Sequence, residues 1–303
     1  MENLSIERLL EEIKLKHTNI IKIEKGWSKQ EKFIIDTKDG KFNLTIFEKE
    51  NLLRKEEIFN YQKKLYDSNI KVAKPIKLLS FGNKGVALFE YIEGFDGEEI
   101  ISSLPKEAQY KVGFQAGVEL KKMHELKAPS EIESWGSRKI RKHKRYQELY
   151  QMTNFKLENS NMILDFINDH LRLINDRPNI FQHDDYHIGN MIIKNNNLVG
   201  IIDFDLMDFG DPYHDLIKAG NISVCSSEEF CIGQIDGYFH PEKPNNYFWK
   251  IYSIYGAMSA ISSAVWLEKY HPTRFDEGMR GVYRMIDDHN NFQNIIPKWY
   301  KGE

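Results

Sequence analysis

Along the first ninety residues, apolar and polar positions alternate in short runs, which is typical of β-strands. This pattern predicts five strands, at residues 20–24, 32–36, 42–47, 76–80 and 86–91. Asp39-Gly40 between the second and third runs favours a tight hairpin. From Asn51 to Asp67 the apolar residues recur at helical spacing instead. We therefore expect an antiparallel sheet with one inserted helix.

The pattern changes at residues 93–97, where two glycines within four residues favour a hinge or domain boundary. Beyond it, helical spacing predicts helices at 105–125, 139–151, 162–175, 228–238, 246–269 and 275–291. One hairpin is expected among them, with strands at 190–194 and 198–204. We predict an α+β protein with a sheet-rich N-terminal lobe, residues 1–93, and a mainly helical C-terminal lobe, residues 94–303.

The composition is that of a folded protein, with 303 residues, of which 41% are hydrophobic and 13% aromatic. The two cysteines, Cys225 and Cys231, exclude a disulfide framework, and their spacing matches no metal site. Lys and Arg number 42 against 45 Asp and Glu, so the net charge is −3. This balance gives no indication of a nucleic-acid-binding protein, and we interpret the basic run at 138–145 as a solvated helix face.

The chain contains no apolar stretch long enough to span a bilayer, and its first residues are acidic rather than apolar. We therefore expect a cytoplasmic protein that contacts neither membrane nor nucleic acid.

Candidate chemistry is concentrated in residues 181–205. Asp185 and Asn190 lie five positions apart across a loop that contains Gly189, and Asp203 ends an apolar run that reads as a buried strand. Two carboxylates and one amide oxygen form a hard oxygen site, which suits Mg²⁺ held together with substrate phosphates. Phosphoryl transfer needs such a metal and a carboxylate that accepts the proton of the incoming hydroxyl.

Three motifs in order extend this interpretation. The chain reads His-Asp-Asp-Tyr-His-Ile-Gly-Asn at 183–190, Ile-Asp-Phe at 202–204 and Gly-Asp-Pro-Tyr-His-Asp-Leu at 210–216. The first resembles the His-Gly-Asp-x-His-x-x-Asn motif of the aminoglycoside phosphotransferase (choline-kinase-like) family, which has a two-lobed protein-kinase-like fold. The other two resemble the Ile-Asp-Phe and Gly-Asp-Pro-x-x-Asp-Leu segments of that family.

The resemblance implies roles for individual residues. Asp185 becomes the catalytic base, and Asn190 and Asp203 become ligands of Mg²⁺, with ATP or GTP as phosphate donor. His183 and His187 would support the loop.

The likeness also covers the nucleotide site. Gly26, Trp27 and Ser28 resemble the loop that covers the nucleotide phosphates. Residues 89–94 resemble the linker between the lobes, where Glu90 and Ile92 would hydrogen-bond the purine through main-chain atoms. The resemblance spans roughly residues 20 to 265.

Two departures from the family pattern stand out. The third strand normally carries a cation that pairs with the phosphates and with an acid of the next helix, but here the position falls on or near Thr45. The lysines that could replace that cation are Lys32, Lys41 and Lys49. We favour Lys32, which follows the phosphate loop, and expect the helix acid to be Glu57 or Glu56. Asp184 replaces the usual Gly, and Asp tolerates a positive φ better than most residues.

The leading hypothesis is a small-molecule O-phosphotransferase whose acceptor is an aminoglycoside-like antibiotic or a metabolite alcohol. Acidic residues at 276–277 and 287–288 would suit a cationic acceptor. Thr45 keeps open the alternative of a non-catalytic nucleotide-binding, pseudokinase-like module. A metal-dependent phosphohydrolase built on His183 and His187 is a third possibility, with His124 and His143 as further ligands.

Overall fold

The structure is a computed structural model that describes residues 6–24 and 30–300. The chain divides into two compact units. The first comprises Met1–Gly94 together with Val199–Asp205, and the second comprises Phe95–Leu198 and Leu206–Glu303. The predicted boundary at residue 93, between an N-terminal nucleotide-binding lobe and a C-terminal helical lobe, stays a proposal. Within the described residues, no helix combines the length and apolarity needed to cross a bilayer.

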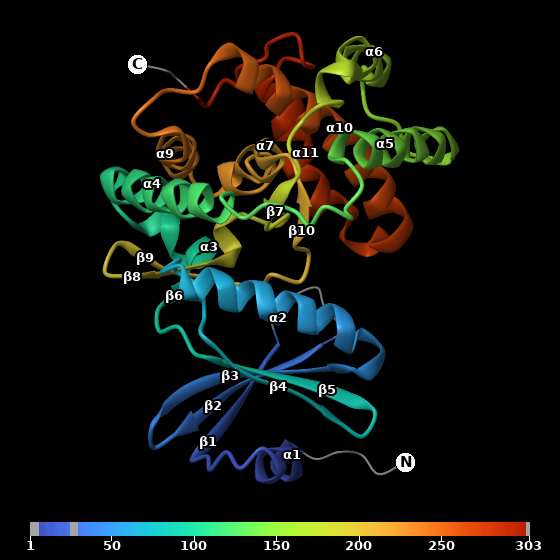
Figure 1. The fold of residues 1–303 in the computed structure, drawn as a ribbon. Coiled ribbons are helices and arrows are strands. Elements are labelled where there is room, and N and C mark those ends of the chain that lie inside the picture. The colour runs from blue at the N-terminus through green and yellow to red at the C-terminus, as the bar shows by residue number, and fades with distance from the viewer. Residues whose placement is uncertain (1–5, 25–29, 301–303) are drawn as a thin grey trace. The chain divides into compact units, whose positions relative to one another are not determined.

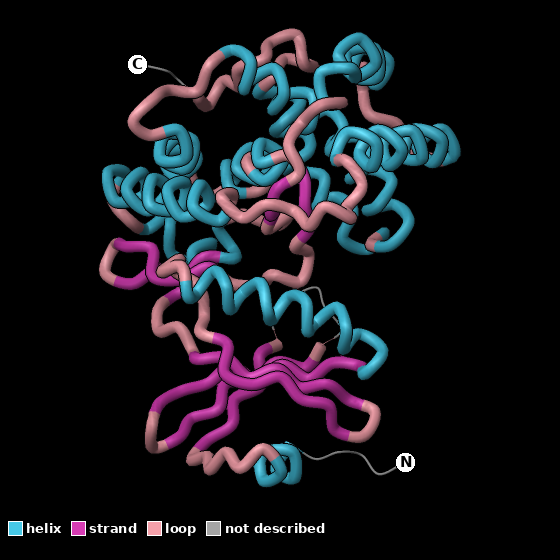
Figure 2. The backbone as a smooth tube through the Cα atoms, in the orientation of Figure 1, coloured by secondary structure: helices cyan, strands magenta, loops and turns pink. Residues whose placement is uncertain are grey.

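The first unit is built on a five-stranded antiparallel sheet, which Figure 2 shows in magenta. Its strands run in the order β1-β2-β3-β5-β4, and their bounds are β1 Asn19–Ile23, β2 Glu31–Thr37, β3 Gly40–Glu48, β4 Pro75–Phe81 and β5 Lys84–Glu90. All five predicted strands are confirmed. The β2–β3 turn closes with Thr37 paired to Gly40, whose φ of +139° is a conformation that glycine adopts readily.

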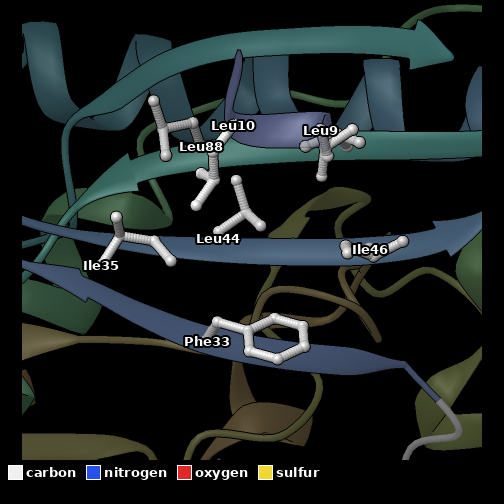
Figure 3. Close-up of a cluster of buried hydrophobic side chains, with 8 residues drawn as sticks. Leu9, Leu10, Phe33, Ile35, Leu44, Ile46 and Leu88 are labelled. Carbon is white, nitrogen blue, oxygen red and sulfur yellow. The ribbon is translucent and has the colours of Figure 1, made fainter. Parts of the chain in front are cut away.

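One face of this sheet is covered by a short helix that the sequence pattern did not indicate, α1 (Ile6–Glu12). Leu9 and Leu10 of α1 are fully buried against alternate strand residues (Figure 3). The strand residues of this core are Phe33, Ile35, Leu44, Ile46, Val86 and Leu88. Because side chains alternate along a strand, the intervening residues Lys32, Thr45 and Ala87 lie on the opposite face.

The predicted helix α2 (Leu52–Asp67) is also confirmed, and it lies on that opposite face in Figure 1. Its buried residues are Ile58, Gln62 and Leu65. Phe59 contacts Phe89 of β5 with ring centroids 5.6 Å apart, which anchors the helix to the sheet. The end of β9 and the residues after it, Val199–Asp205, belong to this unit, and the Ile201 N–H donates to the Lys71 carbonyl at 2.8 Å.

The second unit is mainly helical (Figure 1). Its helices are α3 Gly97–Ile100, α4 Lys106–Met123, α5 Trp135–Met152, α6 Ser160–His170, α7 Pro212–Asp215, α8 Ile217–Asn221, α9 Glu228–Phe239, α10 Asn246–Tyr270 and α11 Phe275–Asp288. The helix predicted at 162–175 is divided, because α6 ends at His170 and a 3₁₀ turn follows at Leu171–Ile174.

Helices α4 and α9 pack with their backbones in close contact. A methyl group at Gly117 would lie 2.1 Å from the carbonyl oxygen of Gln234, and one at Gly233 would lie 2.1 Å from that of Tyr110. Only glycine fits at such positions, so these residues set the distance between the two helices.

Short strands support the motif residues. Two of them, β7 (Ile180–Gln182) and β10 (Asp208–Gly210), form an antiparallel pair that periodicity did not indicate. The predicted hairpin consists of β8 (Met191–Lys194) and β9 (Asn197–Ile201), with β6 (Phe95–Asp96) beside β8. β9 ends earlier than expected, so Asp203 follows the strand rather than ending it.

Candidate functional site

The loop 183–190 follows β7, and a buried carboxylate fixes its backbone. Asp215, at the end of α7, accepts hydrogen bonds from the N–H groups of His183 at 2.8 Å and Asp184 at 2.7 Å. Its Oδ2 also lies 3.1 Å from Nε2 of His124. Asp184 adopts a φ of +61°, a left-handed backbone conformation that Asp adopts more readily than most residues other than glycine. The conformation at the start of the loop is therefore set by Asp215.

The Asp185 carboxylate is held at both of its oxygens. The Lys218 ammonium lies 3.0 Å from Oδ1, the Asn190 amide nitrogen lies 3.1 Å from Oδ2, and His187 Nε2 lies 3.4 Å from Oδ2. Burial tends to raise the pKa of Asp185, but the His187 hydrogen bond and the Lys218 charge outweigh it and hold the pKa well below its usual value. This carboxylate is therefore ionised and fixed in orientation.

Asn190 and His187 are oriented by the same loop. The Asn190 Nδ2 group also donates to the Asp185 carbonyl at 2.9 Å. Its two hydrogens thus go to the carbonyl and to Oδ2 of Asp185, and in the described part of the chain Oδ1 makes no hydrogen bond, so Oδ1 is the atom left for a ligand. His187 Nδ1 accepts the Gly189 N–H at 3.1 Å, which leaves Nε2 to carry the proton and donate to Asp185.

Lys218 of α8 is a site residue that the sequence analysis missed. It lies just beyond the Gly-Asp-Pro segment, in a position that no motif marks. Burial tends to lower its pKa, but the charges of Asp185 and Asp184 raise it above the ordinary value, so the side chain stays a cation.

A buried lysine extends the polar network behind the loop. Lys139 Nζ lies 2.6 Å from His214 Nε2, and His214 Nδ1 lies 3.1 Å from Asp184 Oδ1. Burial and the neighbouring Lys142 lower the pKa of Lys139 to about 7. Burial tends to raise the pKa of Asp184, but the His214 contact outweighs it and lowers that pKa to about 2. The basic run at 138–145 is thus not wholly a solvated face, since Lys139 is buried.

In the first unit, a second polar cluster surrounds Asp203. Lys32 Nζ lies 3.2 Å from Asp203 Oδ2, and Asp203 has a φ of +64°. Lys32 is the cross-strand partner of Thr45, which in turn pairs with Ala87. The expected strand cation is therefore absent at Thr45, and a lysine on the neighbouring strand occupies the same face of the sheet.

Lys55 of α2 lies in this cluster and was also missed. Its ammonium contacts Asp205 Oδ1 at 2.5 Å and Gln30 Oε1 at 2.9 Å. Burial tends to raise the pKa of Asp205, but the charge of Lys55 outweighs it and lowers that pKa. The helix acid expected at Glu57 is not found here, because Glu57 pairs with Arg54 on the same helix.

Other expected residues have different surroundings. Glu56 and Lys49 are exposed, and Lys41 lies 3.6 Å from Asp36. Of these candidates and Lys32, only Lys32 contacts Asp203.

The two predicted linker residues, Glu90 and Ile92, differ in their main-chain hydrogen bonds. The Glu90 N–H donates to the Lys74 carbonyl, whereas within the described residues the Ile92 N–H makes no main-chain hydrogen bond. The Ile92 side chain packs on Gly200, where a methyl group would lie 2.4 Å from Ile92 Cδ1. The predicted phosphate-loop residues Gly26, Trp27 and Ser28 lie outside the described residues.

Three of the four acidic residues near the C-terminus pair with cations in the structure. Glu277 pairs with Arg274, Asp287 with Lys298 and Asp288 with Arg284. That these acids suit a cationic acceptor stays a prediction.

The histidines of the phosphohydrolase alternative have partners other than a shared metal centre. His183 Nδ1 accepts the Asp185 N–H, and His124 lies between Asp215 and Tyr238. Within residues 6–24 and 30–300, no three or more His, Cys, Asp or Glu side chains are grouped to hold a metal ion.

Known proteins resemble this chain in sequence and in fold. A profile described as "Phosphotransferase enzyme family" matches residues 19–247. A search of curated proteins gave no match. Among solved structures, a gentamicin complex of APH(2")-IIa is similar with a TM-score of 0.66 and 16% identity, covering 96% of this chain and 99% of that one.

Two further solved structures are similar over nearly their whole length. A thermostable APH(4)-Ia in complex with ADP and hygromycin B has a TM-score of 0.67 and 14% identity, covering 94% of this chain and 97% of that one. Spectinomycin phosphotransferase, APH(9)-Ia, in complex with ADP and spectinomycin, has a TM-score of 0.62 and 16% identity, covering 99% and 94%. At these identities the likeness shows the fold, which is the predicted α+β, protein-kinase-like one.

Proposed function

The chain belongs to the phosphotransferase enzyme family, and from this premise we propose that it transfers the γ-phosphoryl group of ATP or GTP to a hydroxyl group of a small molecule, with Asp185 as the catalytic base. The observation that carries the proposal is the Asp185 carboxylate, which Lys218, Asn190 and His187 hold ionised and oriented. A positioned carboxylate is the group that phosphoryl transfer needs to orient the attacking hydroxyl.

The proposed reaction makes and breaks one bond at phosphorus. The acceptor oxygen forms a bond to the γ-phosphorus, and the bond from that phosphorus to the β-phosphate oxygen breaks, which releases a nucleoside diphosphate. The hydroxyl proton passes to Asp185. Because the pKa of Asp185 is low, the carboxylate is a weak base, and proton transfer is expected late, when the phosphorus–oxygen bond is already forming.

We propose Asn190 and Asp203 as the ligands of Mg²⁺. They flank the β8–β9 hairpin, with Asn190 directly before β8 and Asp203 after β9. Their donor atoms fit this ion, since Asn190 has an amide Oδ1 available and Asp203 is a carboxylate that Lys32 contacts at Oδ2. When bound, Mg²⁺ would neutralise charge on the nucleotide phosphates.

The proposed nucleotide site also includes the predicted linker and phosphate-loop residues. Ile92 would contribute its main-chain N–H, which has no main-chain partner within the described residues, and Glu90 would contribute its carbonyl oxygen. The loop of Gly26, Trp27 and Ser28 remains a proposal from the sequence alone.

We expect Lys32 to be the phosphate-binding cation that replaces the one absent at Thr45. Its contact with Asp203 places a positive charge beside a proposed metal ligand. Lys32→Ala should therefore lower kcat/KM for the nucleotide by at least tenfold, since removing one donor to a charged transition state typically costs about 3 kcal/mol. The measurement is steady-state turnover over a range of nucleotide concentrations.

Lys41→Ala is the matched control for this prediction, because Lys41 pairs with Asp36 at the hairpin end of the neighbouring strand. It should leave both nucleotide affinity and turnover within about threefold of the wild type. If Lys32→Ala behaves like the control, Lys32 does not contact the phosphates.

The function itself is tested by nucleotide consumption across a panel of acceptors. The panel should contain aminoglycosides, choline, homoserine and neutral sugars, each with MgATP and with MgGTP. Acceptor-dependent release of nucleoside diphosphate, together with an acceptor mass increased by one phosphoryl group, is the expected result. Asp185→Asn provides the blank for contaminating kinases.

Thr45 motivates a second candidate function, a nucleotide-binding module without turnover. On that hypothesis the protein would bind MgATP or MgGTP tightly but transfer phosphate to no member of the panel. Tight binding with no acceptor-dependent turnover would therefore favour the second candidate over the first.

A further inference from the structure

Lys55 of α2 joins three separate segments of the first unit. Its ammonium bonds Asp205, which follows β9, and Gln30, which precedes β2. Gln30 Nε2 in turn donates to Asp205 Oδ2 at 2.7 Å, so the three side chains form a closed ring of hydrogen bonds. Each of the three side chains therefore hydrogen-bonds the other two.

This cation is largely removed from solvent. The Lys55 side chain is 12% exposed, and its ammonium lies 5.5 Å from the centroid of the Phe47 ring on β3. A charge in such surroundings depends on its partner, because removing either member leaves an uncompensated charge in a partly buried site. An exposed lysine pair would carry no comparable requirement.

The ring and the proposed phosphate site draw residues from the same two segments of the chain. Gln30 lies two residues before Lys32, and Asp205 lies two residues after Asp203. Lys32 and Asp203 themselves form an ion pair at 3.2 Å. The two lysines thus bind alternate acids of one short segment, Lys32 from the sheet and Lys55 from the helix.

We propose that Lys55 is a positioning residue of the nucleotide-phosphate site: its pair with Asp205, closed by Gln30, fixes the segment that carries Asp203 against the strand that carries Lys32. The charges run opposite to those expected from the family resemblance, in which a strand cation meets a helix acid. Here the helix supplies the cation and the segment after β9 supplies the acid. In this way α2 fixes the distance between Asp203 and Lys32, although neither residue belongs to α2.

The inference rests on the proposed function, because it assigns Lys55 to the site where nucleotide phosphates are proposed to bind. A merely structural pair would change stability alone, whereas a positioning pair also changes nucleotide affinity. The decisive measurement is therefore the Kd for MgATP and MgGTP by calorimetric titration, which needs no acceptor and no turnover. If the wild type binds nucleotide but phosphorylates no acceptor, the proposed function fails while this test still runs.

Four variants of the full chain separate the possibilities. Lys55→Met and Asp205→Asn each break the pair, and Lys55→Glu combined with Asp205→Lys reverses it. Lys63→Met is the matched control, since Lys63 is an exposed residue of the same helix. The melting temperature of each variant is measured beside its Kd, and Lys55→Gln, which keeps a hydrogen-bond donor, substitutes for Lys55→Met should that variant not fold.

We expect Lys55→Met and Asp205→Asn each to weaken nucleotide binding roughly tenfold, and the reversed pair to recover at least threefold of that loss. Lys63→Met should bind as the wild type does. A Kd within threefold of the wild type in both single variants would overturn the proposal, whatever their melting temperatures. A reversed pair that binds no better than the weaker single variant would overturn it as well.

Discussion

Asp185→Asn should reduce phosphoryl transfer by about 10²–10⁴-fold, the usual contribution of a positioned general base. The amide cannot accept the acceptor proton, but it has nearly the size of the carboxylate, and its one oxygen can still accept a hydrogen bond from either Lys218 or Asn190. The loop backbone should also persist, because Asp215 rather than Asp185 binds its N–H groups. The measurement is kcat with saturating nucleotide and the acceptor identified from the panel.

Nucleotide Kd and melting temperature should stay close to the wild-type values in Asp185→Asn. Asp165→Asn, an exposed acid on α6, is the matched control and should leave kcat unchanged. Retention of more than a tenth of the wild-type kcat in Asp185→Asn would remove this residue from the role of base.

Arg177→Ala should give a large loss of stability, about 3–5 kcal/mol in the free energy of unfolding. Arg177 forms a bidentate pair with Asp211, with Nε–Oδ2 at 2.6 Å and Nη2–Oδ1 at 2.8 Å. Asp211 is fully buried and also accepts the Tyr255 hydroxyl at 2.7 Å. Without the guanidinium, a buried carboxylate loses its counter-charge. Denaturant unfolding monitored by tryptophan fluorescence measures the effect.

Arg141→Ala is the control for this prediction. Arg141 makes an equally good bidentate pair, with Glu133, but both side chains are exposed. Solvent screens such a pair, so its loss should leave the free energy of unfolding nearly unchanged. If the two variants unfold at the same denaturant concentration, burial of Asp211 does not make its pair important for stability.

Much of the fold was predictable because its signals are local. The five strands and the long helices follow from periodicity, and Asp39-Gly40 specifies its hairpin through turn geometry. α1 was not predictable in this way, since a seven-residue helix is marginal by itself. It forms where Leu9 and Leu10 can be buried on the sheet, which is a tertiary effect.

The candidate site likewise contains residues that local sequence predicts and residues that only tertiary packing brings together. The sequence by itself determined the family and the group of Asp185, His187 and Asn190, because these residues lie within one tight loop whose spacing brings them together. Only the tertiary structure decided which cations accompany them. Lys218 reaches Asp185 from 33 positions away and Lys55 reaches Asp205 from 150, and contacts over such separations depend on how helices pack rather than on any local pattern.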